Sequence, residues 1–126
     1  MRAPSIAARL PVGPEAAGLA RDAVGELDER VPAGVMEDLR LLVSELVTNS
    51  VRHARMPASG NVLLEVRLSP SRVRVEVFDR GAGFDPPPAS APVAGRGWGL
   101  YLVDAIASRW GSTRGPTSSV WFELDL

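Results

Sequence analysis

Two neighbouring segments of alternating residues constrain the fold of this chain more than any other feature. They are Asn61–Ser69 (NVLLEVRLS) and Arg72–Asp79 (RVRVEVFD), and Ser69–Pro70–Ser71 reads as a hairpin turn between them. In the second segment valines alternate with charged residues, so one face of the strand is apolar and the other is wet. This pattern favours an antiparallel sheet that helices cover on one side only.

The rest of the chain predicts three helices and two further strands around this hairpin. Apolar residues recur at helical spacing in 14–31, 35–54 and 97–110, and Gly111 is expected to cap the third helix. The segments Ile6–Leu10 and Ser119–Leu126 read as strands, the first at a sheet edge. Pro86–Ala94 (PPPASAPVA) reads as a low-complexity loop. With no internal repeat, residues 1–126 are expected to form a single domain.

The composition excludes several kinds of chemistry. The chain has no cysteine, which excludes disulfides, thiolate metal sites and cysteine nucleophiles. It also has no lysine, because all 14 basic residues are arginine. A Walker-A loop, the strand lysine of the usual protein-kinase fold and a Schiff base each require lysine. Any phosphate binding must therefore use backbone amides, arginine and metal.

Charge and hydropathy argue against two classes of partner. The net charge is −1, so no bulk field attracts the chain to nucleic acid or to an acidic membrane surface. No apolar run reaches the length of a membrane span, and the N-terminus lacks a charged segment followed by a long apolar core. We expect a cytoplasmic protein with no direct contact to nucleic acid or membrane.

The second helix carries the first candidate site, in the stretch Leu42–Ala54 (LVSELVTNSVRHA). Glu45 and Asn49 are one helical turn apart and project from the same side. A helical projection places them, with Arg52, at the border of the apolar arc, where a residue lining a cleft would lie. A carboxylate beside a neutral oxygen donor suits hydrated Mg²⁺ and a hydroxyl awaiting deprotonation. The alternative is a polar pair on a solvated helix face.

A second candidate site follows the hairpin, at DRGAGF. Asp79 ends the predicted strand, and Gly81 and Gly83 follow at once. A carboxylate at a strand end can accept a hydrogen bond from an exocyclic amine such as that of adenine, and glycines let backbone approach a flat ring. The alternative is a plain strand-to-loop turn. The pattern does not match the G-x-G-x-x-G motif of a Rossmann dinucleotide site, because Pro86 occupies the position of its third glycine.

A third candidate site begins the last predicted helix, at GRGWGL. Amides of Gly97 and Gly99 at a helix N-terminus form an anion site that needs no lysine, and Arg96 could add a charge-assisted contact. The alternative is a flexible linker that leads into a helix. The single histidine, His53, and the three tryptophans are read as structural residues.

In order and content, the three motifs resemble the GHKL ATPase superfamily, which includes gyrase, Hsp90 and histidine kinases. Residues 42–54 look like its N box, 79–84 like its G1 box, 85–96 like its ATP lid and 95–103 like its G2 box. The short lid and the NSVRHA variant are similar to the branch of anti-sigma-factor serine/threonine kinases. The resemblance implies the Bergerat fold: an α+β, two-layer α/β sandwich with a mixed, mainly antiparallel sheet and helices on one face.

The resemblance also implies roles for the matching residues of the N and G1 boxes. Asn49 would coordinate Mg²⁺ that bridges the phosphates of ATP, and Glu45 would be the general base for a serine or threonine hydroxyl. Asp79 would bind the adenine amine in a pocket that Gly81 and Gly83 shape.

In the G2 box, Gly97 and Gly99 would offer amides to the phosphates. Two departures are notable: the lid is short and rich in proline, and Trp98 is bulkier than the residue usual in the family.

The function implied is an ATP- and Mg²⁺-dependent regulator. It would phosphorylate a serine or threonine of an antagonist protein and could sequester a sigma factor, with a homodimer as an oligomeric state that relatives adopt. Two alternatives stay open: a nucleotide-dependent binding module without kinase activity, and a stand-alone histidine-kinase-type catalytic domain. Glu45 separates the first alternative from a kinase, because binding alone needs no base.

Overall fold

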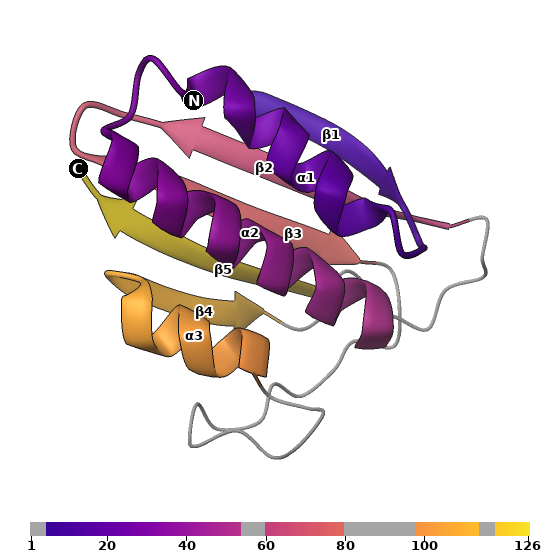
Figure 1. The fold of residues 1–126 in the computed structure, drawn as a ribbon. Helices are drawn as coiled ribbons and strands as arrows, with labels where there is room; N and C mark the ends of the chain where they lie inside the picture. Colours follow the sequence, from indigo (N-terminus) through magenta and orange to yellow (C-terminus); the bar gives the residue numbers. More distant parts are fainter. Residues whose placement is uncertain (1–4, 54–59, 80–97, 114–117) are drawn as a thin grey trace.

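The computed structural model describes residues 5–53, 60–79, 98–113 and 118–126, in which five strands form one sheet (Figure 1). The strands are β1 (Ile6–Pro11), β2 (Asn61–Leu68), β3 (Arg72–Asp79), β4 (Arg109–Thr113) and β5 (Ser118–Asp125). They lie in the order β1-β2-β3-β5-β4, and each neighbouring pair is antiparallel. The predicted hairpin is therefore confirmed, and β1 is an edge strand as expected.

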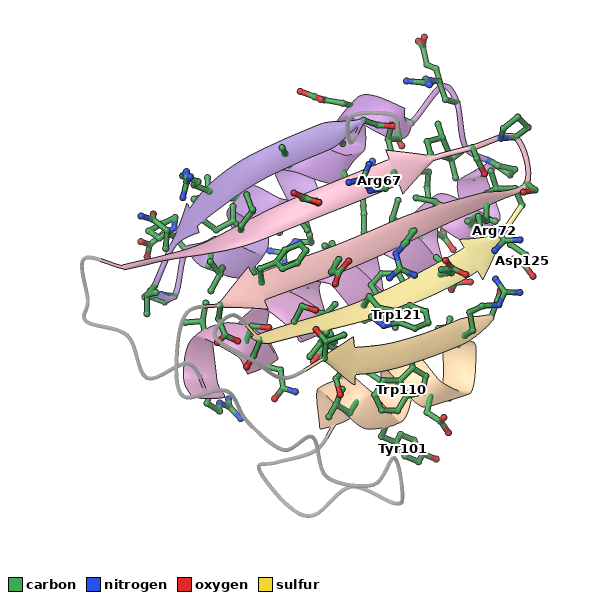
Figure 2. All side chains as sticks on the ribbon, turned by 180° about the vertical axis from the view of Figure 1, so that it is seen from behind. Arg67, Arg72, Tyr101, Trp110, Trp121 and Asp125 are labelled. Atoms are coloured by element: carbon green, nitrogen blue, oxygen red, sulfur yellow. The ribbon has the colours of Figure 1, made fainter. Side chains whose placement is uncertain are left out.

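Three α-helices cover one face of this sheet (Figure 1). They are α1 (Ala16–Val24), which continues into the short 3₁₀ turn η1 (Gly25–Leu27), α2 (Ala33–His53) and α3 (Trp98–Ile106). The opposite face of the sheet carries no helix among the described residues (Figure 2). The α+β two-layer sandwich is thus confirmed. None of the helices in these described ranges combines the length and the hydropathy of a membrane crossing.

The core lies between the helices and the inward face of the strands. Val73, Val75 and Val77 of β3 are at most 1% exposed, while the charged residues between them face outward. On α2 the predicted apolar arc is buried from Leu39 to Ser50. The apolar faces of the helix and of the strands are therefore buried in the same core, so the local sequence patterns agree with the overall fold.

The prediction of the third helix was wrong at its C-terminal end. The helix ends at Ile106, and Trp110 and Gly111 lie in β4, which pairs with β5. Gly111 is not a helix cap: it lies opposite Trp121, and a Cβ on it would come within 2.9 Å of the indole ring. The Trp110 indole N–H donates to the Asp104 carboxylate of α3 at 2.9 Å. Strand pairing, which depends on distant residues, overrides the local helical pattern here.

Candidate functional site

The ends of two helices and two strands carry the three sequence motifs or lie beside them. In Figure 1, α2 and β3 end on the right, and α3 and β5 each begin at their own right-hand end. Asp79 of β3 lies opposite Ser118 of β5, and α2 packs against α3. The three sequence motifs belong to these same ends, because Leu42–His53 lies in α2, Asp79 ends β3, and Trp98 begins α3. The fold therefore brings together motifs that are far apart in the sequence.

Asp79 is the predicted adenine-binding carboxylate, and it is buried. It closes β3 on the face that also carries Val73, Val75 and Val77, which is the face under the helices. Only 2% of Asp79 is exposed. A carboxylate is rarely buried to this extent unless polar partners or a ligand surround it, so the position is more than a solvated turn.

Ser118 lies directly opposite Asp79 in the β3–β5 pairing. It is 3% exposed, and its hydroxyl has no hydrogen-bond partner among the described residues. A buried hydroxyl without a partner costs free energy, and such groups are normally satisfied by water or ligand. Ser118 was not among the predicted site residues, because the predicted strand began one residue later. The pair of serines before the last apolar run is the one signal in the sequence that marks it.

Glu45 and Asn49 occupy the border that the helical projection predicted. Both are half-buried on α2, whereas Leu46 and Val47 between them are fully buried and Thr48 is exposed. α2 packs against α1, α3 and strands β2, β3 and β5, so it is the central helix of its layer. A rigid central helix is a suitable support for a carboxylate and an amide that must hold a fixed spacing.

Part of the predicted site falls outside the described residues. That part consists of Gly81, Gly83, Gly97 and the segment 85–96, which includes Arg96, and the roles predicted for them remain predictions. Gly99 is the second residue of α3, whose N-terminus therefore begins where the G2-like motif predicts a helix. Free amides and the helix dipole make this a position where anions are stabilised.

The available donors fit a nucleotide better than a metal held by protein alone. Among the residues with described placement, no group of three acidic, histidine or cysteine side chains could hold a metal ion. Mg²⁺ commonly takes few protein ligands and completes its shell with water and phosphate oxygens, so a single amide such as that of Asn49 is sufficient. The buried Asp79 and the unsatisfied Ser118 hydroxyl supply an acceptor and a donor suited to a purine edge.

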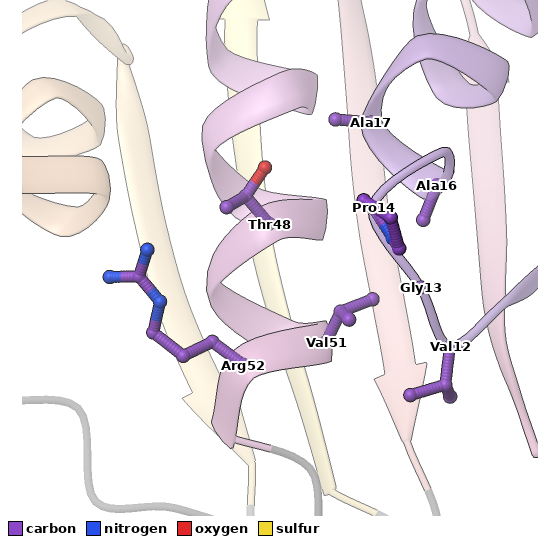
Figure 3. A pocket seen from close by; sticks show the side chains of 8 residues that line it. All are labelled: Val12, Gly13, Pro14, Ala16, Ala17, Thr48, Val51 and Arg52. Carbon is purple, nitrogen blue, oxygen red and sulfur yellow. The ribbon is translucent and has the colours of Figure 1, made fainter. Parts of the chain in front are cut away.

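A separate pocket of about 320 Å³ lies on the other side of α2, against the β1–α1 connection (Figure 3). Val12, Pro14 and Val51 give it a mainly apolar lining, and Val51 points into it while the Arg52 side chain extends away from α1. Among the described residues, none of those predicted to bind nucleotide lines this pocket. Arg52 is exposed.

Comparisons with known proteins agree with the geometry. A protein family described as the histidine kinase-like ATPase domain matches residues 10–122. A curated protein of Listeria innocua, named serine-protein kinase RsbW, is 34% identical over 83 residues, which cover 64% of this chain and 53% of that protein. The protein of the same name from Oceanobacillus iheyensis is 28% identical over 113 residues, which cover 78% of this chain and 72% of that protein. This chain spans about half the length of the first of these relatives.

Solved structures show the same fold. The histidine kinase domain of a blue-light-activated histidine kinase from Erythrobacter litoralis has a TM-score of 0.55 and 25% identity, covering 92% of this chain and 61% of that one. The Acinetobacter baumannii histidine kinase AdeS has a TM-score of 0.56 at 12% identity, and the likeness covers 99% of this chain and 68% of that one. At 12% identity the second likeness concerns the fold alone.

Proposed function

Because this chain belongs to the histidine kinase-like ATPase domain family, we propose that it is an ATP- and Mg²⁺-dependent regulator of the anti-sigma type. It phosphorylates a serine or threonine of a small antagonist protein and sequesters a sigma factor. Relatives named serine-protein kinase support this choice within the family. The observation that carries the proposal is the buried Asp79 at the end of β3, opposite Ser118 of β5, whose hydroxyl has no hydrogen-bond partner among the described residues.

In this proposal each of the following residues has one task. Asp79 accepts a hydrogen bond from the exocyclic amine of adenine, and the Ser118 hydroxyl satisfies a neighbouring polar atom of the purine or a bound water. Asn49 holds Mg²⁺ through its side-chain oxygen. Gly97 and Gly99 offer amides to the phosphates. Bound ATP supplies the terminal phosphoryl group.

Glu45 acts as the general base. The acceptor hydroxyl oxygen forms the new bond to phosphorus while ADP leaves, and the hydroxyl proton passes to the Glu45 carboxylate. Glu45 lies one turn before Asn49 on the same helix, and both are half-buried. Since phosphoryl transfer depends mainly on positioning and charge neutralisation, the fixed spacing along α2 is the main contribution of this element.

Titration of the purified chain with a non-hydrolysable ATP analogue, with and without Mg²⁺, tests the nucleotide site. Asp79→Asn should weaken binding about tenfold or more, because it removes a hydrogen bond to a charged acceptor. Asn49→Asp should change the Mg²⁺ dependence of binding. The control Asp22→Asn alters an exposed acid on α1 and should have no effect. Unchanged binding in both site variants would exclude the proposed site.

Transfer of radiolabelled phosphate from ATP to a candidate antagonist protein tests the kinase activity. Glu45→Gln should lower the transfer rate about a hundredfold or more while leaving nucleotide affinity within about twofold. Glu37→Gln changes an exposed acid on the same helix and serves as the matched control. Equal rates for wild type and Glu45→Gln would disprove the role of Glu45. Nucleotide binding without any transfer would favour a binding module, and acid-labile phosphate on the acceptor would favour a histidine-kinase-type domain.

A further inference from the structure

The sheet face away from the helices carries a row of charged residues that crosses four strands (Figure 2). In this row Arg67 of β2 lies opposite Arg74 of β3, Arg74 lies opposite Glu123 of β5, and Glu123 lies opposite Arg109 of β4. Like charges directly across a pair of strands destabilise a sheet unless other charges compensate them. The pairing of Arg67 with Arg74 therefore calls for negative charge nearby.

Three carboxylates supply that negative charge: Glu65 pairs with Arg67 at 3.4 Å, Glu76 pairs with Arg74 at 3.6 Å, and Glu123 makes the largest number of contacts. Glu123 accepts hydrogen bonds from Arg109 at 2.9 Å, from Arg74 at 3.0 Å and from Arg72 at 3.4 Å. Burial by itself would raise the pKa of Glu123, but the hydrogen bonds from Arg109 and Arg74 outweigh it and lower the pKa below its ordinary value. A single ionised carboxylate is thus shared among three guanidinium groups.

A pocket of about 420 Å³ opens beside this cluster. It is lined by Ser5, Arg30, Arg67, Leu68, Ser69, Arg72, Arg74 and Glu123. Among the described lining residues four side chains are cationic and one is anionic, so they carry three more positive than negative charges. Glu65 and Glu76, which pair with Arg67 and Arg74, lie outside the lining. Arg30, in the segment between η1 and α2, is exposed and forms no ion pair with any other described residue.

We propose that this arginine-lined pocket docks an acidic segment of a partner protein. Guanidinium groups bind carboxylates through paired N–H donors, and they lose less on desolvation than ammonium groups do. The net charge of the whole chain is −1, so the positive charge is local to this pocket and the molecule as a whole does not attract an extended polyanion. Those two facts favour a short run of aspartate and glutamate over nucleic acid.

The pocket is remote from the candidate nucleotide site. β3 runs from Arg72 at the pocket to Asp79 at the nucleotide site, and these eight residues extend about 23 Å at the usual rise of a strand. Figure 2 shows Arg67 and Arg72 near the end of the sheet away from the tip of β3. The docking proposal therefore stands independently of the proposed phosphotransfer.

Fluorescence anisotropy with a short labelled peptide in which Glu alternates with Ser tests the pocket. The wild type should bind this peptide, and should bind the counterpart with Gln in place of every Glu much more weakly. Arg30→Gln and Arg72→Gln should each weaken binding about threefold, and the double variant about tenfold. Arg9→Gln is the matched control: it removes an exposed arginine of β1 that is outside the pocket. Its effect should stay within about 1.5-fold, because distant exposed charges are screened.

Three results would overturn the proposal. The first is no binding of the acidic peptide by the folded wild type. The second is an equal loss of affinity in Arg9→Gln, which would indicate attraction by overall charge alone. The third is tighter binding of a labelled single-stranded oligonucleotide through the same two arginines. The affinity for the ATP analogue should be unchanged in the double variant, so this test can fail or succeed separately from that of the nucleotide site.

Discussion

At the scale of single residues, the substitution of Ser118 tests whether its hydroxyl serves ligand binding or the stability of the fold. Its buried hydroxyl has no partner among the described residues, so removing that hydroxyl should not destabilise the free protein. We expect Ser118→Ala to leave the unfolding free energy in urea unchanged or to raise it by about 1 kcal/mol. The same variant should bind the ATP analogue about fivefold more weakly, because one hydrogen bond to the ligand is lost.

Ser112→Ala provides the control for that experiment, because Ser112 is exposed on β4 and should affect neither quantity. A loss of stability in Ser118→Ala without any change in nucleotide affinity would show that the hydroxyl serves the fold and not the ligand.

Gly111 shows a second residue whose identity the fold requires. A Cβ at this position would lie 2.9–3.0 Å from three atoms of the Trp121 indole, whose ring is also stacked under the Arg74 guanidinium at 4.2 Å. The ring can therefore move aside only by giving up that stacking. We expect Gly111→Ala to lower the unfolding free energy by about 1–3 kcal/mol, measured by urea denaturation.

The matched control is Gly34→Ala at the start of α2, where a Cβ would meet nothing within 4 Å. There alanine should raise the unfolding free energy by about 0.5 kcal/mol, because it reduces the flexibility of the unfolded chain and favours helix. Equal stability of the two variants would mean that Trp121 adjusts without cost.

At the scale of secondary structure, the sequence predicted an element correctly where the residues of that element alone carry the periodic pattern. The alternation in Arg72–Asp79 predicted β3 with the bounds that the structure shows, and the helical arc placed Glu45 and Asn49 at the border of α2. The pattern failed at Arg109–Thr113, because these five residues acquire their strand conformation by pairing with β5. Pairing with a strand that follows later in the chain is not visible in a local window.

The Glu123 cluster ties β3, β4 and β5 together, and its contribution should depend on pH. Because the folded pKa of Glu123 lies below the ordinary value of 4.5, the unfolded chain binds this proton more readily than the folded one. Its stabilisation is therefore complete above that value and is lost as the pH falls through the folded pKa. We expect Glu123→Gln to lower the unfolding free energy by about 1 kcal/mol at pH 7, and by less near about pH 3.5.

Urea denaturation of wild type and variant at both pH values measures this difference. Asp28→Asn is a suitable control, because Asp28 forms an exposed ion pair with Arg40 at 2.6 Å. This substitution should lower the unfolding free energy by less than about 0.5 kcal/mol at pH 7. A penalty for Glu123→Gln that stays constant with pH would show that packing, and not charge, is responsible.

At the scale of the whole molecule, the three motifs predicted a candidate site, but the sequence did not indicate Ser118, which lies opposite Asp79 in the sheet. The order of the three motifs and the one-sided hairpin were enough for the fold class. Ser118 escaped notice because its importance arises from its register against Asp79, 39 positions earlier in the chain. Such a relation exists only once the strands are paired.

The candidate nucleotide site and the arginine-lined pocket should also be separable by the effect of ligand on stability. A ligand that binds only the folded state raises the unfolding free energy, by about 2.7 kcal/mol when its concentration is 100 times Kd. With the ATP analogue and Mg²⁺ at that ratio, wild type should show the full increase in urea denaturation. At the same concentration Asp79→Asn should show about 1.4 kcal/mol or less, because its Kd is expected to be about tenfold higher or more. The double variant Arg30→Gln/Arg72→Gln should keep the full increase, because its substitutions lie at the opposite end of β3. A reduced increase in the double variant would mean that the arginine-lined pocket and the nucleotide site are coupled through the sheet.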